Sequence, residues 1–225
     1  MVDKLPSIYV VGDSHVRDWE YLKKNKLSTK LNVLGGNRKP AKTAYYLSKQ
    51  ENINLLLQPA LNQSEYIDYL GIYLGEVDCG ASLWNHKFNT LEYRLNIATD
   101  NLINFADYAL TYKNKIGNVI LMGPIIPLLQ DYKTIPWLSQ LRRQVDADCK
   151  QRTELTLKFC SNLKAKCKLK NYLYLDINDL LVDKTTKIVK EEILKKYADK
   201  NHLLLPHGAK LWLKRIENKI KENRK

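Results

Sequence analysis

Short apolar runs alternate along the chain with longer segments in which apolar residues recur at helical spacing. The runs are rich in β-branched residues, as buried strands are. They predict five strands, at residues 7–11, 31–34, 71–74, 118–122 and 172–175. This alternation is typical of an α/β fold in which helices cover both faces of a parallel sheet.

The segments between these runs predict helices. They cover residues 16–24, 41–49, 92–112, 138–166 and 187–197, and a last helix runs from Pro206 through Ile220. Pro206 suits the first turn of that helix, where its missing N–H would have no partner. A loop containing Gln130, Asp131 and Tyr132 leaves the fourth strand at its carboxyl end. Open α/β sheets bind ligands at that end, so we expect this loop to shape a substrate site.

Length and composition favour one domain over residues 1–225. A chain of 225 residues with 44% hydrophobic content can bury one sizeable core. No apolar stretch approaches the roughly 20 residues that span a bilayer, and the N-terminus lacks the basic start and apolar block of a secretory signal. We therefore expect a cytoplasmic protein without a membrane span.

The four cysteines are widely spread and form no Cys-x-x-Cys pair. Reduced thiols are expected, and neither a metal site nor a cofactor is predicted. The formal net charge of +13 raises the question of an acidic partner such as nucleic acid. Most of the excess is lysine scattered along predicted helices after residue 160, without an aromatic stacking platform. Solvated helix faces explain this charge, so a nucleic-acid partner is not expected.

The first predicted strand is followed by Gly12-Asp13-Ser14-His15. Ser14 should therefore lie at the carboxyl edge of the sheet, with its backbone N–H at the start of the next helix. A helix N-terminus stabilises negative charge such as the oxyanion that forms when a serine attacks an ester. The alternative is a plain turn in which Asp13 or Ser14 caps the helix.

Asp199 and His202 lie in a predicted loop between the last two helices. A serine needs an imidazole as base and a carboxylate that orients the imidazole, and these two residues could supply both. The alternative is an Asp cap beside an exposed histidine. His207 is a rival base, His15 is expected to pack or cap rather than act as base, and His86 could line the pocket.

These blocks resemble the SGNH (GDSL-type) hydrolase superfamily. The matching residues are Gly12-Asp13-Ser14-His15 and Asp199-x-x-His202 before the final helix. The resemblance implies a flavodoxin-like three-layer α/β/α fold with a five-stranded parallel sheet. It also implies acyl-ester hydrolysis, often of acetyl groups on carbohydrates. Gly35 or Gly36, after the second strand, would match the glycine whose N–H joins that of Ser14 in binding the oxyanion.

Gly75-Glu76-Val77-Asp78 resembles the family's Gly-x-Asn-Asp block but departs from it at Val77. The usual asparagine donates a hydrogen bond to the oxyanion, and losing such a donor costs about 2.7 to 4 kcal/mol of transition-state stabilisation. Replacement donors would be Asn37, Arg38 or Asn85. Glu76 and Asp78 could hold loops, contact substrate hydroxyls or be solvated. The expected pocket residues are Asp13, Asn37, Glu76, Asp78 and Asn85.

The sequence thus predicts a serine esterase that removes a small acyl group, such as acetyl, from a carbohydrate or similar polar substrate. Ser14 would be the nucleophile, His202 the base and Asp199 the orienting acid. Two alternatives remain open. One is an O-acyltransferase of the same fold, in which a sugar hydroxyl replaces water. The other is a catalytically inactive glycan-binding relative, to which Val77 points.

Overall fold

The computed structural model describes residues 4–40, 42–85, 89–129, 132–133, 139–199 and 202–223. Its centre is a five-stranded sheet whose neighbouring strands are all parallel, in the order β2-β1-β3-β4-β5. The strands are β1 (Ser7–Gly12), β2 (Asn32–Arg38), β3 (Ile67–Tyr73), β4 (Ile116–Met122) and β5 (Leu173–Leu175). The predicted fold class is confirmed.

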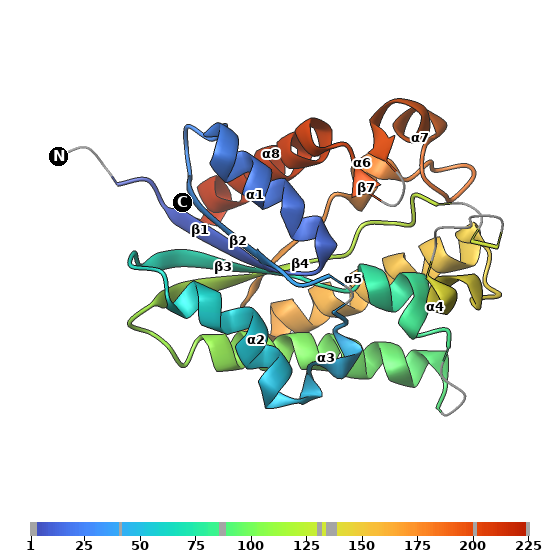
Figure 1. Cartoon of the computed structure of the whole chain (residues 1–225), viewed down its shortest axis with the longest axis horizontal. Coiled ribbons are helices and arrows are strands. Elements are labelled where there is room, and N and C mark those ends of the chain that lie inside the picture. Colours follow the sequence, from blue (N-terminus) through green and yellow to red (C-terminus); the bar gives the residue numbers. More distant parts are fainter. Residues whose placement is uncertain are drawn as a thin grey trace.

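Helices cover both faces of this sheet (Figure 1). One face carries α1 (Arg17–Asn25) and α8 (Leu205–Asn223), and the other carries α2 (Gln50–Leu61), α3 (Leu91–Ala109) and α5 (Cys149–Lys170). Alternate residues of β1 enter the two cores, because successive side chains of a strand point to opposite faces. Ile8 and Val10 pack with the α1 and α8 side, whereas Tyr9 and Val11 pack with the other.

The remaining elements are short. They are the single helical turns η1 (Ser14–Val16), η2 (Tyr45–Ser48) and η3 (Asp78–Ser82), the helices α4 (Gln140–Arg143), α6 (Asn178–Leu181) and α7 (Glu191–Tyr197), and the antiparallel pair β6 (Ala198–Asp199) with β7 (His202–Leu203).

The helix predicted at 41–49 is wrong. Lys49 has an extended backbone, with ψ of 123°, and α2 begins after it at Gln50. Its buried residues Ile53, Leu56, Leu57 and Ala60 recur at helical spacing. Pro59 is tolerated in the last turn, although proline usually disfavours a helix interior.

The single helix predicted at 138–166 is two helices, α4 and α5. The chain leaves α4 after Arg143, and α5 begins at Cys149. A capping box sets this start, because the Asp148 carboxylate accepts from Gln151 N and the Gln151 side chain accepts from Asp148 N. The second and third strands are also longer than predicted, since β2 runs to Arg38 and β3 starts at Ile67.

The strand order reverses between β1 and β3, the place where open α/β sheets form their ligand crevice. The two strand ends approach closely there. Asp13 N donates to Tyr73 O at 3.1 Å, and a Cβ on Gly12 would lie 1.9 Å from that same oxygen. Gly12 is therefore required by the backbone contact. Ser14 and Glu76 follow these strand ends on either side of the crevice.

Three further observations concern membrane helices, metal-binding groups and thiols. None of the described helices combines the length and apolarity that a membrane crossing requires. Within the same residues, His, Cys, Asp and Glu side chains form no group of three suited to hold a metal ion. All four cysteines are unpaired and buried.

Candidate active site

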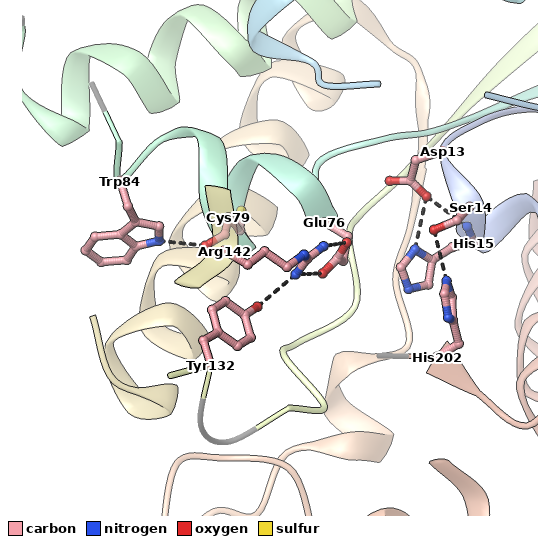
Figure 2. A network of polar contacts seen from close by, with 9 residues as sticks. All are labelled: Asp13, Ser14, His15, Glu76, Cys79, Trp84, Tyr132, Arg142 and His202. Atoms are coloured by element: carbon pink, nitrogen blue, oxygen red, sulfur yellow. Dashed lines mark hydrogen bonds and ion pairs between the residues drawn. The ribbon is translucent and has the colours of Figure 1, made fainter. Parts of the chain in front are cut away.

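Ser14 and His202 meet at the carboxyl edge of the sheet, although 188 residues separate them (Figure 2). Ser14 starts η1 directly after β1, and His202 starts β7. Ser14 Oγ lies 2.9 Å from His202 Nε2, and both side chains are partly exposed. The rival His207 is stacked on Tyr197, with ring centroids 3.9 Å apart. The structure thus brings His202 to the serine.

Asp199 lies opposite His202 in the β6–β7 pair, where their Cα atoms are in register. Its side chain lies outside the described part of the structure. The orienting acid of the triad therefore stays a prediction.

Asp13 and His15 flank the serine as a buried pair. Asp13 Oδ1 accepts from His15 N at 2.9 Å and lies 3.0 Å from His15 Nδ1. His15 packs, as expected, but it does so against the proposed base. Its ring lies against the ring of His202, with centroids 4.7 Å apart.

The two histidines differ in their protonation. Burial favours a neutral His15 ring, but the Asp13 carboxylate outweighs it and raises the His15 pKa to about 9. Burial, together with the positive charges of His15 and Arg17, lowers the pKa of His202 to about 3. At neutral pH, His15 is an imidazolium and His202 a neutral base that can accept the serine proton.

Glu76 follows β3 and forms a buried bidentate ion pair with Arg142 of α4 (Figure 2). Arg142 Nη1 donates to Glu76 Oε1 at 2.9 Å, and Nη2 donates to Oε2 at 2.6 Å. Tyr132 Oη accepts from Arg142 Nη1 at 2.8 Å. Burial opposes ionisation of Glu76, but Arg142 lowers its pKa to about 2. This network fixes the loops after β3 and β4 against each other.

Asp78 holds a loop rather than being solvated. Its carboxylate accepts from Ala44 N at 2.7 Å and from Tyr45 N at 2.9 Å, and the side chain is fully buried. Burial raises its pKa to about 7, against the opposing effect of these backbone donors. Of the alternatives for Glu76 and Asp78, the holding of loops is thus the one observed.

The replacement oxyanion donors suggested by the sequence are engaged elsewhere. Asn37 Nδ2 donates to the carbonyls of Leu55 and Leu56, and Asn85 Nδ2 donates to those of Ala81 and Leu141. A side-chain amide has two N–H donors, so neither has one left. Arg38 is exposed and lies 3.7 Å from Glu20. The amides of Asn37 and Asn85 are therefore not free to bind an oxyanion, and their place in the pocket stays a prediction.

Gly35 and Gly36 lie within β2 rather than after it, because the strand continues to Arg38. Gly36 is in register with Val10, and Gly35 with Tyr9. A Cβ on Gly36 would lie 2.4 Å from Val16 Cγ1, so close packing under η1 explains this glycine. Their expected position after the strand is therefore wrong, and the assignment of either N–H to the oxyanion stays a prediction. The chain after β2 begins at Lys39, whose N–H donates to Gly12 O at 2.8 Å.

Arg142 is the residue at this edge that sequence reasoning missed. It lies in a segment predicted as continuous helix, and a buried arginine leaves no signal in a pattern of apolar positions. Tyr132 belongs to the loop that was expected to shape the site, and it joins the network. Gln130, Asp131 and His86 lie outside the described residues.

Comparison with known proteins supports the fold. No protein-family model and no curated protein matches the sequence. A putative acylhydrolase from Bacteroides fragilis NCTC 9343 superimposes with a TM-score of 0.63 at 15% identity, over 100% of this chain and 90% of its own. A GDSL-like lipase from Bacteroides thetaiotaomicron VPI-5482 superimposes with a TM-score of 0.61 at 17% identity, over 99% of this chain and 91% of its own.

A third similar structure is Est24, a carbohydrate acetylesterase from Sinorhizobium meliloti. Its TM-score is 0.62 at 13% identity, over 96% of this chain and 99% of its own. At such low identity the shared property is the arrangement of strands and helices. The chain has the fold of the GDSL-type (SGNH) hydrolases.

Proposed function

We propose that this chain is a serine esterase that removes a small acyl group, acetyl above all, from a carbohydrate or similar polar alcohol. The observation that carries the proposal is the 2.9 Å contact between Ser14 Oγ and His202 Nε2 at the strand-order reversal. A neutral imidazole at hydrogen-bond distance is what activates a serine hydroxyl. The carbohydrate part rests on the likeness to Est24, named as a carbohydrate acetylesterase.

The reaction has two halves. His202 Nε2 takes the Ser14 proton as Oγ attacks the ester carbonyl, and it then gives this proton to the leaving alkoxide. Water, deprotonated by the same nitrogen, releases the acid from the acyl-enzyme. Asp199, three residues before His202, orients the imidazole through its other nitrogen.

The oxyanion is stabilised by the N–H of Ser14 at the beginning of η1. With Val77 in the asparagine position, and with Asn37 and Asn85 occupied, a second donor is expected from the backbone of Gly36 or Gly35, or of the chain beyond Lys39. This segment passes the same edge of the sheet, since Lys39 N bonds to Gly12 O.

Hydrolysis of p-nitrophenyl acetate and of a longer-chain homologue tests the proposal. Ser14→Ala and His202→Ala should each lower kcat by a factor of 10³ or more, as triad losses do. His207→Ala is the matched control, because this histidine stacks on Tyr197, and it should retain activity. Preference for the acetyl ester would support a small acyl pocket.

A fluorophosphonate probe measures the nucleophile separately from turnover. Labelling of the wild type that Ser14→Ala abolishes supports a reactive serine even when the ester chosen is poor. Wild-type hydrolysis no faster than that of the variants, together with no labelling at Ser14, would overturn the esterase and favour a glycan-binding relative. Acyl transfer to an added sugar instead of water would identify an O-acyltransferase.

A further inference from the structure

A continuous column of rings runs from His202 into the core through a second histidine. His15 lies 4.7 Å from His202, 5.8 Å from the ring of Tyr73, and Tyr73 lies 5.0 Å from Trp212, all between centroids. Tyr73 and Trp212 are fully buried and His15 almost so. His202 therefore lies against a buried ring, that of His15.

We propose that the Asp13–His15 pair is a positioning element for His202: Asp13 holds the positively charged His15 ring against the ring of the base, which keeps His202 neutral and directed at Ser14. The proposal rests on the esterase function above. It gives a role to a histidine that a simple serine–histidine–acid arrangement does not require.

The pair is held firmly in place. Asp13 Oδ1 is bound twice by the same residue, through His15 N and through His15 Nδ1, so the ring cannot rotate without losing a buried ion pair. Asp13 also caps η1, the turn that starts with Ser14. One carboxylate thus fixes the position of the nucleophile and the orientation of the ring beside the base.

The charges around the two histidine rings determine which of them is protonated. His202 faces His15, Arg17 and Arg142, which disfavour its protonation, and Glu76, which favours it. Asp199, its opposite residue in β6–β7 and the orienting acid proposed above, also favours it. His15 faces the carboxylates of Asp13, Glu76 and Asp18. His15 therefore stays cationic, and its charge makes a second positive charge on His202 unfavourable.

This arrangement affects two proton transfers. The fraction of His202 ready to accept the Ser14 proton stays high in mildly acidic solution, because the neutral ring is favoured. The same positive charge of His15 makes neutral His202 a weaker base toward Ser14 and makes its imidazolium a stronger acid, so the gain lies in the second transfer, in which the proton passes to the leaving alkoxide.

His15→Asn is the variant of choice, because its amide can still donate to Asp13 Oδ1 while the charge and the ring are lost. The rate of fluorophosphonate labelling at Ser14, followed from pH 3.5 to 8, should show an acidic limb that moves to higher pH by about one to two units. His207→Asn removes a histidine away from Ser14 and should leave the limb unchanged. An unmoved limb in folded His15→Asn overturns the proposal.

NMR titration of the imidazole signals separates this proposal from the function on which it rests. In the wild type, His15 should stay protonated at pH 7 while His202 is neutral, and in His15→Asn the His202 titration should move upward. A His15 that is neutral at pH 7 overturns the proposal without any variant. If Ser14 is unreactive but the titration moves as expected, the esterase fails and the coupling of the two rings stands.

Discussion

Two buried ion pairs lie at the same edge of the sheet, and they are built differently. In Glu76–Arg142 both carboxylate oxygens accept from one guanidinium, and the partners come from loops after different strands. In Asp13–His15 the partners are two residues apart, and only Oδ1 is bound, while Oδ2 is buried without a partner among the described residues.

The Glu76–Arg142 pair is a permanent contact, whereas the Asp13–His15 pair is titratable. Arg142 is charged at every accessible pH, and its pKa is raised further by Glu76, whose own pKa falls to about 2. The first pair therefore stays ionised in any working buffer and joins two loops. His15 loses its charge near pH 9, so the second pair controls a charge beside the base and contributes little to long-range connection.

The largest expected effect comes from breaking the permanent pair. Arg142→Met leaves Glu76 buried and unpaired, which should lower the free energy of unfolding by about 3 to 5 kcal/mol. Urea denaturation at pH 7 measures it. The double variant Glu76→Leu, Arg142→Met removes both charges and should recover much of the loss. Equal losses in the single and double variants would mean that the charge pair is not the cause.

For the titratable Asp13–His15 pair we expect a pH-dependent difference in the free energy of unfolding between wild type and His15→Asn. Its size should be similar to the effect of Arg142→Met or smaller. Because the folded-state pKa of His15 is raised from 6.5 to about 9, its stabilising contribution is complete below pH 6.5 and disappears as pH rises through 9. The free energy difference between wild type and His15→Asn should shrink by roughly 3 kcal/mol over that range. A difference that is constant between pH 6 and 10 would contradict a charged His15.

The smallest effect is expected at Tyr132, the neutral residue that accepts a hydrogen bond from Arg142 of the permanent pair. Tyr132→Phe removes the hydroxyl that accepts from Arg142 Nη1 and keeps the ring, over which the Arg152 guanidinium lies at 3.5 Å. The free energy of unfolding should fall by about 1 kcal/mol. Labelling at Ser14 should be unchanged, because the Glu76–Arg142 contacts remain. A loss of labelling would show that Tyr132 contributes to the site directly.

Sequence reasoning succeeded where one residue type and its place after a strand define a role. Ser14 follows β1 and meets His202, and the five strands appear in the expected order along the chain. Local signals of this kind are strong because the carboxyl edge of a parallel sheet collects whatever follows its strands.

Sequence reasoning failed where a side chain is hydrogen-bonded or ion-paired to a residue far away in the sequence. Asn37 and Asn85 looked available in the sequence, yet Asn37 donates to the carbonyls of Leu55 and Leu56 and Asn85 donates to that of Leu141, which only the folded chain brings near. Arg142 could not be foreseen for the same reason, since its partner Glu76 lies 66 positions earlier. The glycine error has another cause, because the end of β2 is set by pairing with β1 and not by its own apolar run.

His202 and Ser14 are held by structural elements of different size. Ser14 continues from a strand hydrogen-bonded on both sides in the main sheet, whereas His202 sits on the two-residue pair β6–β7, outside that sheet. Protection of backbone amides against hydrogen exchange should accordingly be far lower at His202 than in β1. We expect opening of this small pair alone to separate His202 from Ser14, so that the proposed esterase activity is lost on warming before the sheet unfolds.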